Sequence, residues 1–253
     1  MPRLESPDVV LLVDTFTRWF EPENARAASR VLASGGWAAM SAEPPEGRPY
    51  CCGRTYLSAG MLDEAREEGA RLVAGLAPYA RRGASIVGLE PSCLYTLRDE
   101  IPALLRSEAA EVVSRQALLL EEFLDHEWDS GHELAFTGSG DKHVLVHGHC
   151  HQKAFGGTEA TLRMLGRIPG HQASLIPSGC CGMAGAFGYQ AEHFRTSMQM
   201  GELALFPAVR EAGADAVIVA DGTSCRAQID DGTGRTAVHA AVVLERALEP
   251  AIR

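Results

Sequence analysis

Seven cysteines, and the way they are grouped, are the chemically most informative feature of this 253-residue sequence. Two pairs are adjacent, Cys51-Cys52 and Cys180-Cys181, and a glycine follows each pair. Neighbouring Cα atoms lie about 3.8 Å apart across a trans peptide, which is below the roughly 4.4–6.8 Å that a disulfide spans. An odd number of cysteines also fits poorly with a closed set of disulfides. The pairs therefore indicate metal binding or thiol chemistry.

The cysteines divide the chain into two similar halves. In each half a CCG loop is followed by a helix-like segment, an apolar run and a serine-cysteine pair: "YCCGRTY" and "GLEPSC" in the first, "SGCCGMAGAFGY" and "VADGTSC" in the second. "VVLLVDT" and "VLVHGHC" also correspond, so Thr15 stands where Cys150 stands. The repeated spacing indicates an internal duplication. We expect a first unit over residues 1–128 and a second over 129–253.

Short apolar runs alternate with amphipathic segments along both halves. Strands are predicted at 9–15, 37–40, 85–90, 143–149, 173–177 and 216–221, and helices at 22–34, 60–79, 94–127, 157–168, 190–205 and 238–248. This alternation predicts an α/β fold of two small, pseudo-repeated Rossmann-like units with parallel sheets. Since the cysteines follow strands or precede helices, they are expected at the carboxyl edges of the sheets, where ligands bind in open α/β folds.

The second half supplies four thiols, Cys150, Cys180, Cys181 and Cys225. Four is the usual number of ligands for an iron–sulfur cluster or a zinc ion. Gly182 would let the backbone approach such a centre, and the helix expected to begin near Tyr189 would direct its N-terminal end toward it. The alternative is that some of these cysteines are ordinary buried core residues.

Histidines surround Cys150 in "HVLVHGHCHQK", at positions 143, 147, 149 and 151. Alternate residues of a strand face one side, so these four are expected to share a side. They could bind metal, relay protons or bind a substrate carboxylate. Alternatively they hydrogen-bond to cluster sulfurs or loop carbonyls, which we favour for His147. His149 and His151, beside Cys150, are the candidate catalytic and cofactor-binding histidines.

Three further polar residues lie at the ends of predicted elements. Asp14 and Asp221 end strands, and His239 opens the last helix. Helix capping is the expected role of both aspartates, and His239 is expected to be an ordinary residue at the start of its helix.

These motifs resemble a known family. The chain is similar to the cysteine-rich "CCG" domain pair of heterodisulfide reductases and of glycolate/lactate oxidase iron–sulfur proteins, and most closely to the C-terminal region of FAD-linked D-2-hydroxyacid oxidases. The resemblance rests on "VDTFTRWFEPENARAA", "CCGRTYLSAGMLDEA", "VGLEPSCLYTLRDE", "VHGHCHQKA", "SGCCGMAGAFGY" and "VIVADGTSCRAQI". It implies a [4Fe–4S] cluster, in some members of non-cubane form. The implied ligands are Cys150, Cys180, Cys181 and Cys225.

The first half departs from the family pattern. Cys51, Cys52 and Cys93 match, but Thr15 replaces the leading cysteine. This site is therefore expected to be empty, occupied by zinc, or completed by a residue of the other half. The last cysteine of the family's extended CxxC ending is also absent from both halves, which read "SCLYT" and "SCRAQ". This absence argues against heterodisulfide chemistry.

Charge and hydropathy limit the partners. The net charge is −10 and there is no basic run, which argues against nucleic acid and anionic membranes as main partners. No apolar run reaches the roughly 18 residues of a transmembrane segment, and the N-terminus has no signal-peptide pattern. We expect a cytoplasmic protein, with peripheral attachment to a membrane left open.

Three functions are compatible with these patterns. The leading hypothesis is an iron–sulfur electron-transfer module or subunit. It would accept electrons from a flavin-containing dehydrogenase partner that oxidises a D-2-hydroxyacid such as glycolate, lactate or 2-hydroxyglutarate. No flavin-binding pattern is present, so FAD is expected only on the partner. The onward carrier would be a quinone or a ferredoxin-type iron–sulfur protein, since the ferredoxin cysteine run is absent from this chain.

The two alternatives belong to other classes. In the first, the cluster itself is a disulfide reductase, with His149 or His151 as the proton donor. In the second, the chain is a zinc-binding, non-redox assembly domain. Whether the chain alone is an enzyme stays open.

Overall fold

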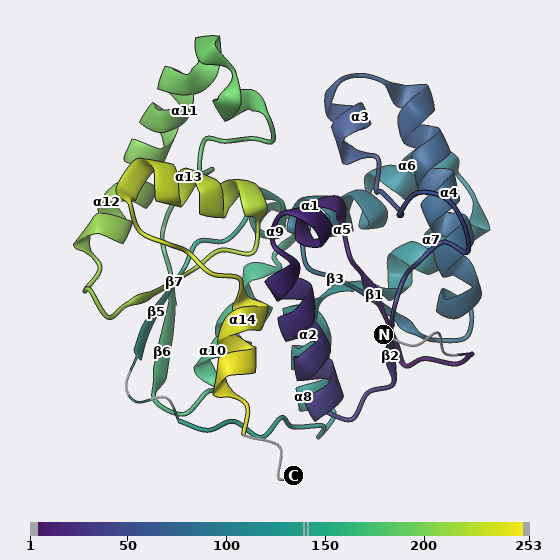
Figure 1. The fold of residues 1–253 in the computed structure, drawn as a ribbon, viewed down its shortest axis with the longest axis horizontal. Helices are drawn as coiled ribbons and strands as arrows, with labels where there is room; N and C mark the ends of the chain where they lie inside the picture. Colours follow the sequence, from purple (N-terminus) through teal and green to yellow (C-terminus); the bar gives the residue numbers. More distant parts are fainter. Residues whose placement is uncertain (1–4, 139, 141, 250–253) are drawn as a thin grey trace. The chain divides into compact units, whose positions relative to one another are not determined.

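The protein is described by a computed structural model that covers residues 5–138, 140 and 142–249 (Figure 1). The chain divides into two compact units, Met1–Leu134 and Ala135–Arg253. The division lies a few residues beyond residue 128, where the sequence suggests a boundary. We refer to these parts as unit 1 and unit 2.

Unit 1 contains a four-stranded parallel sheet. Its strands are β1 (Val9–Leu12), β2 (Ala39–Ser41), β3 (Ser85–Gly88) and β4 (Ala117–Leu119), in the order β2-β1-β3-β4. All four residues of β1 are buried. A central parallel strand is covered by helices on both faces, which explains why its sequence is a continuous apolar run.

Within the described residues, eight helices surround this sheet. They are α1 (Thr15–Trp19), α2 (Pro22–Ser34), α3 (Arg54–Ser58), α4 (Leu62–Ala80), α5 (Pro91–Arg98), α6 (Glu100–Leu105), α7 (Glu108–Gln116) and α8 (Leu120–Asp129). Figure 1 shows α4, α6 and α7 on one side of the sheet and α2 and α8 on the other. Leu72 and Leu76 of α4 and Ile86 of β3 are fully buried in the core that results.

Unit 2 repeats the arrangement with fewer strands. Strands β5 (Lys142–Val146), β6 (His171–Leu175) and β7 (Val217–Val219) are parallel, in the order β6-β5-β7. This order matches β2-β1-β3 of unit 1. A single parallel bridge joins Val238 to Val219, at the place that β4 occupies beside β3. The predicted α/β class and its two pseudo-repeated units with parallel sheets are thus confirmed.

The helices of unit 2 also follow the repeat. They are α9 (Cys150–Phe155), α10 (Thr158–Gly166), the 3₁₀ turn η1 (Phe187–Tyr189), α11 (Ala191–Glu202), α12 (Leu205–Glu211), α13 (Thr223–Thr233) and α14 (Ala240–Ala247). In Figure 1, α10 and α14 lie on one side of the sheet and α12 and α13 on the other. Phe206, Val209 and Ile229 pack with Ile218 of β7 in its core.

Two sequence expectations are wrong in detail. Residues 94–127, expected to be helical, contain strand β4, because Ala117, Leu118 and Leu119 pair with β3 at the edge of the sheet. Strand β5, expected to reach residue 149, ends at Val146, where the chain turns into α9. The four histidines near Cys150 therefore do not lie along one strand. The sequence does not predict helix α13, because its segment is mostly polar and has a weak apolar periodicity.

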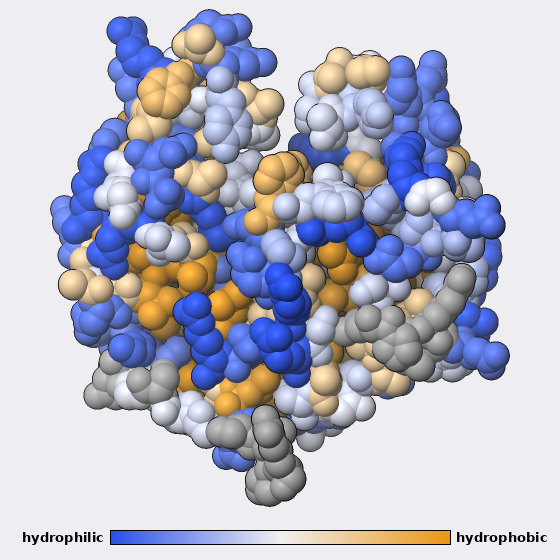
Figure 2. Space-filling view, in the orientation of Figure 1, coloured by the Kyte–Doolittle hydropathy of each residue, from blue (hydrophilic) through white to orange (hydrophobic). Residues whose placement is uncertain are grey.

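The face shown in Figure 2 is largely polar, with apolar residues exposed among polar ones in both units. The larger exposed apolar side chains include Trp19, Phe20, Tyr189, Phe194 and Leu203. Within the described residues, none of the helices has both the length and the apolar character that crossing a bilayer requires.

Asp14 fixes the turn that follows the central strand of unit 1. Its carboxylate accepts hydrogen bonds from the backbone N–H groups of Phe16 and Thr17, at 2.9 and 3.0 Å, and from the Thr17 hydroxyl. The predicted capping role of Asp14 is confirmed, since it is the N-cap of α1. Burial, followed by the nearby Glu90 carboxylate, raises the pKa of Asp14 from 3.8 to about 6.

This shift predicts a pH dependence of stability. Folded protein binds the Asp14 proton more tightly than unfolded protein does. The contribution is therefore fully present below about pH 4 and is lost as the pH rises through about 6. Asp14→Asn keeps a capping side chain but cannot ionise. The free energy of unfolding of the variant relative to wild type should rise by about 2 kcal/mol between pH 4 and pH 7, measured by urea denaturation.

Asp63→Asn is the matched control, because Asp63 lies in the first turn of α4 with its side chain 96% exposed. Because this carboxylate is exposed, its removal should change the free energy of unfolding little at either pH. Parallel profiles for Asp14→Asn and wild type would show that Asp14 ionises in the folded protein as it does in the unfolded chain.

Candidate metal centre

The four cysteines of unit 2 lie at the carboxyl ends of its parallel strands. Cys150 is the first residue of α9, which follows β5, and Cys225 is the third residue of α13, which follows β7. Cys180 and Cys181 lie in the loop that follows β6. Parallel strands of one sheet end at one edge, so three separate loops deliver their thiols to the same place.

The four thiols form a row. Cys150 hydrogen-bonds to Cys180, Cys180 to Cys181, and Cys181 to Cys225. Hydrogen bonding with Cys150 and with Cys181 holds the pKa of Cys180 well below its usual range, and hydrogen bonding with Cys181 does the same for Cys225. Donating to Cys180 raises the pKa of Cys150 and of Cys181. Thiolates are the form of cysteine that binds metals, so the row has metal-binding character.

His147 joins the row at one end. One ring nitrogen of His147 and the sulfurs of Cys181 and Cys225 all lie within 4.8 Å of one another. His147 Nδ1 is 2.9 Å from the Ser178 hydroxyl, and a hydrogen bond with His147 helps to lower the pKa of Cys225. Imidazole nitrogen and thiolate sulfur both bind metal ions, so this end of the row offers a mixed set of ligands.

The donor set can be compared with the needs of zinc and of a cluster. Around one tetrahedral zinc ion, sulfur ligands lie about 3.8 Å apart, given Zn–S bonds of about 2.3 Å. Of the four thiols, Cys181 and Cys225 gather with His147 within 4.8 Å, while Cys180 and Cys150 extend the row. A row of four thiols therefore fits a polynuclear iron–sulfur centre better than a single zinc ion.

The loop that carries the adjacent cysteines depends on a glycine. Gly182 has a φ of +101°, and its N–H donates to Cys180 Sγ at 3.3 Å. A Cβ at this position would lie 2.2 Å from the carbonyl oxygen of Ser197. Only glycine fits here, so Gly182 turns the loop and helps to hold Cys180. Its assignment to cofactor binding stays a prediction.

His149 and His151 flank Cys150, but one of them has a structural task. His149 is the N-cap of α9, and its Nδ1 accepts the N–H of His151 at 3.2 Å. The two rings meet edge to face, with centroids 5.1 Å apart. Nδ1 of His149 is also 3.9 Å from Cys150 Sγ. Both histidines thus lie beside the thiols, whereas His143, on β5, is exposed.

The other two predicted end-of-element residues cap the last helix. His239 is the N-cap of α14 and accepts the N–H of Ala241 at 3.0 Å. Asp221 accepts the N–H of Ala240 at 3.1 Å and the side-chain amide of Gln152 at 3.1 Å. Through Gln152, which also bonds the backbone N–H of His149, Asp221 connects the start of α14 to the start of α9.

Unit 1 holds a three-thiol version of the same arrangement. Thr15 is the first residue of α1, as Cys150 is of α9, and Cys93 is the third residue of α5, as Cys225 is of α13. Cys51 hydrogen-bonds to Cys52, Cys52 to Cys93, and the Thr15 hydroxyl to Cys51. The Gly53 N–H lies 3.5 Å from Cys51 Sγ, as the Gly182 N–H does from Cys180 at 3.3 Å. Thr15 thus takes the place of the leading cysteine.

The surroundings of the unit 1 thiols are acidic. The pKa of Cys93 is raised to about 11, because burial and the carboxylates of Asp14 and Glu90 outweigh a hydrogen bond with Cys52 that lowers it. Asp14 and Glu90 are the N-caps of α1 and α5, where unit 2 has His149 and Gly222. Within the described part of unit 1, no three histidine, cysteine or acidic ligand atoms gather within 4.8 Å.

Two polar neighbours of the thiols, Ser178 and Lys153, are not predicted from the sequence. Ser178 fixes His147, and Lys153 donates to the carbonyl oxygens of Ser178 and Gly179 at 2.6 and 2.7 Å. The spacing of Lys153, three residues after Cys150 and so one helical turn on, is the one signal that could have indicated it.

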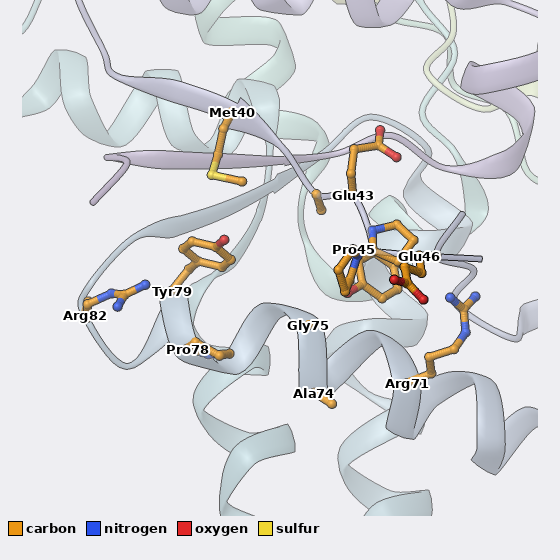
Figure 3. A pocket seen from close by; sticks show the side chains of 13 residues that line it. Met40, Glu43, Pro45, Glu46, Arg71, Ala74, Gly75, Pro78, Tyr79 and Arg82 are labelled. Carbon is orange, nitrogen blue, oxygen red and sulfur yellow. The ribbon is translucent and has the colours of Figure 1, made fainter. Parts of the chain in front are cut away.

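An open cleft of about 500 Å³ lies elsewhere in unit 1, between α4 and the loop after β2 (Figure 3). Arg71 and Arg82 lie at its opposite ends, and Met40 and Tyr79 line it. Arg82 stacks over Tyr79, 5.3 Å from the ring centroid. None of the cysteines lines this cleft, so it is separate from the thiols.

Comparisons with known proteins agree with this geometry. Residues 144–230 match the family described as CCG, cysteine-rich domain. The chain is 31% identical, over 234 residues, to the C subunit of the anaerobic glycerol-3-phosphate dehydrogenase of Escherichia coli K12. These residues are 92% of this chain and 57% of that subunit. The D-2-hydroxyglutarate dehydrogenases of Escherichia coli K12 and Pseudomonas putida are 26% and 27% identical, over 89% and 94% of this chain and 21% and 22% of theirs.

The chain spans about half the length of the glycerol-3-phosphate dehydrogenase component and about a fifth of the two hydroxyglutarate dehydrogenases. The matched residues 144–230 contain all four cysteines of the row in unit 2. The resemblance to cysteine-rich CCG proteins that the sequence motifs indicated is therefore confirmed.

Proposed function

We propose that this chain is an iron–sulfur electron-transfer module of a flavin-dependent dehydrogenase, with one [4Fe–4S] cluster in unit 2. The row of four thiols at the ends of the parallel strands is the observation that carries the proposal. The similarity to regions of two kinds of dehydrogenase supports it. A bound [4Fe–4S] cluster would take up and release single electrons at a potential that its protein surroundings set.

The residues of unit 2 would divide the tasks of holding such a cluster. Cys150, Cys180, Cys181 and Cys225 would be its ligands. His147 would direct Nε2 at it, and Gly182 would keep the loop close to it. Cys150 is exposed, whereas Cys181 and Cys225 are 3% exposed. The side of the cluster at Cys150 would therefore be the one that an electron-transfer partner can approach.

Further features belong to the same proposal. The flavin would be on the partner, which would oxidise a 2-hydroxyacid or a polyol phosphate, the classes named by the relatives. The onward acceptor would be a quinone or a ferredoxin-type protein, and a quinone would place the module at the periphery of a membrane. The cluster would be a cubane or the non-cubane form of the family. The site formed by the three thiols of unit 1 would be empty or would hold zinc.

A specific observation favours a second candidate, a zinc-binding assembly domain. His147, Cys181 and Cys225 already lie close enough to ligate one ion. Metal analysis separates the two candidates, because zinc leaves the protein colourless and free of sulfide.

Metal and sulfide content test the proposal. Wild-type protein purified anaerobically should be brown and contain about four iron atoms and four sulfides per chain. Cys225→Ser should lose both, because it removes the buried end of the row. Cys51→Ser, the matched control in unit 1, should retain them. A colourless wild type with zinc alone would overturn the cluster, and loss of iron from both variants would show that the two sets of cysteines share one centre.

Electron transfer and disulfide reduction are distinguished by turnover. If the cluster only carries electrons, a chemically reduced protein should pass them to a one-electron acceptor dye in a single stoichiometric phase. With an artificial electron donor and a disulfide substrate, it should show no steady-state turnover. Sustained reduction of the disulfide that is lost in His149→Gln or His151→Gln would favour the catalytic alternative instead.

A further inference from the structure

Lys153 is a cation whose contacts lie directly beside the thiols of unit 2. It is the fourth residue of α9, and its ammonium group donates to the carbonyl oxygens of Ser178 and Gly179, at 2.6 and 2.7 Å. These two residues directly precede Cys180. A Cβ on Gly148 would lie 3.1 Å from Lys153 Cε, so the glycine makes room for the lysine side chain. Lys153 thus ties the start of α9 to the loop that carries the adjacent cysteines.

The charge of Lys153 is directed at the thiols. Across the described residues, no carboxylate lies within ion-pair distance of its ammonium group. Its electrostatic partners are Cys225, Cys150, Cys180 and Cys181. Burial lowers the pKa of Lys153, and its electrostatic interactions with the four cysteines oppose that change. Charges interact more strongly in this half-buried position than in water, because the effective dielectric constant is lower.

Unit 1 provides the contrast. Arg18 is the fourth residue of α1, the position that Lys153 has in α9. It also binds the loop that leads to the adjacent cysteines, but through a carboxylate: Arg18 Nη2 is 2.6 Å from Glu43 Oε1. The charge of Arg18 is therefore largely neutralised. The same position in the repeat holds a cation in both units. Among the described residues, Arg18 of unit 1 pairs with a carboxylate, whereas Lys153 of unit 2 has no carboxylate partner and interacts with thiols.

We propose that Lys153 is a positioning residue for the cluster: it holds the Cys180 loop and supplies the half-buried positive charge that makes the cluster easier to reduce. The inference rests on the proposed function, because it requires a cluster in unit 2. Four thiolates give a cluster a net negative charge, and reduction adds one more. A fixed cation nearby stabilises the reduced form more than the oxidised form, which raises the reduction potential.

The test is a redox titration of the holoprotein, followed by electron paramagnetic resonance, with iron and sulfide measured in each sample. Lys153→Gln keeps a hydrogen-bond donor but removes the charge, and Lys153→Arg keeps both. Lys153→Gln should lower the equilibrium constant for one-electron reduction at least tenfold, which is a shift of about 59 mV to lower potential. Lys153→Arg should stay near wild type. Arg18→Gln is the matched control and should leave the potential unchanged.

The outcomes separate this inference from the proposed function. Wild-type protein without iron and sulfide would overturn both. A Lys153→Gln protein that holds the full cluster and has the wild-type potential would overturn only the role of Lys153. The role would also be overturned if Lys153→Arg shifted the potential as much as Lys153→Gln does. An equal shift in Arg18→Gln would have the same meaning. Loss of the cluster from Lys153→Gln, with retention in Lys153→Arg, would support the role of the charge in holding the loop.

Discussion

The gathering of four thiols at one edge of a parallel sheet is the constraint on which the rest of unit 2 depends. The thiols come from loops far apart in the sequence, so only the pairing of β6, β5 and β7 brings them together. Adjacent sulfur ligands that become anionic repel one another, and burial makes that repulsion stronger. The hydrogen bonds along the row, the ring of His147 and the ammonium group of Lys153 offset it. The iron ions of a bound cluster would further reduce the repulsion between the sulfurs.

The two units share the backbone arrangement of the site but differ in the charges around it. The order β2-β1-β3 of unit 1 matches β6-β5-β7 of unit 2. In each unit Thr15 or Cys150 is the first residue of one helix, Cys93 or Cys225 is the third residue of another, and a glycine follows the adjacent cysteines. The charges differ. Asp14 and Glu90 in unit 1 stand where unit 2 has His149 and Gly222, and Arg18 is paired with Glu43. Unit 1 keeps the shape of the site, but its surroundings disfavour an anionic cluster.

Much of this can be predicted from the sequence, because the duplication is local and repeated. The recurring CCG loops, apolar runs and serine-cysteine pairs are enough to predict the α/β class and the correspondence between Thr15 and Cys150. Strand β4 cannot be distinguished from helix, because Ala117, Leu118 and Leu119 suit either state and only pairing with β3 decides. The end of β5 at Val146 depends on the capping of α9 by His149 and Gln152. For Lys153 only the spacing of one helical turn from Cys150 is visible in the sequence, because its partners are backbone carbonyls that carry no sequence signal.

The central claim is that one polynuclear iron–sulfur cluster lies among the four cysteines of unit 2. Anomalous X-ray diffraction at the iron and zinc edges, from crystals of anaerobically purified protein, tests it most directly. The account predicts a group of iron peaks bounded by Cys150, Cys180, Cys181 and Cys225, and no iron beside Cys51, Cys52 and Cys93. A single zinc peak among His147, Cys181 and Cys225, or iron in unit 1, would contradict it.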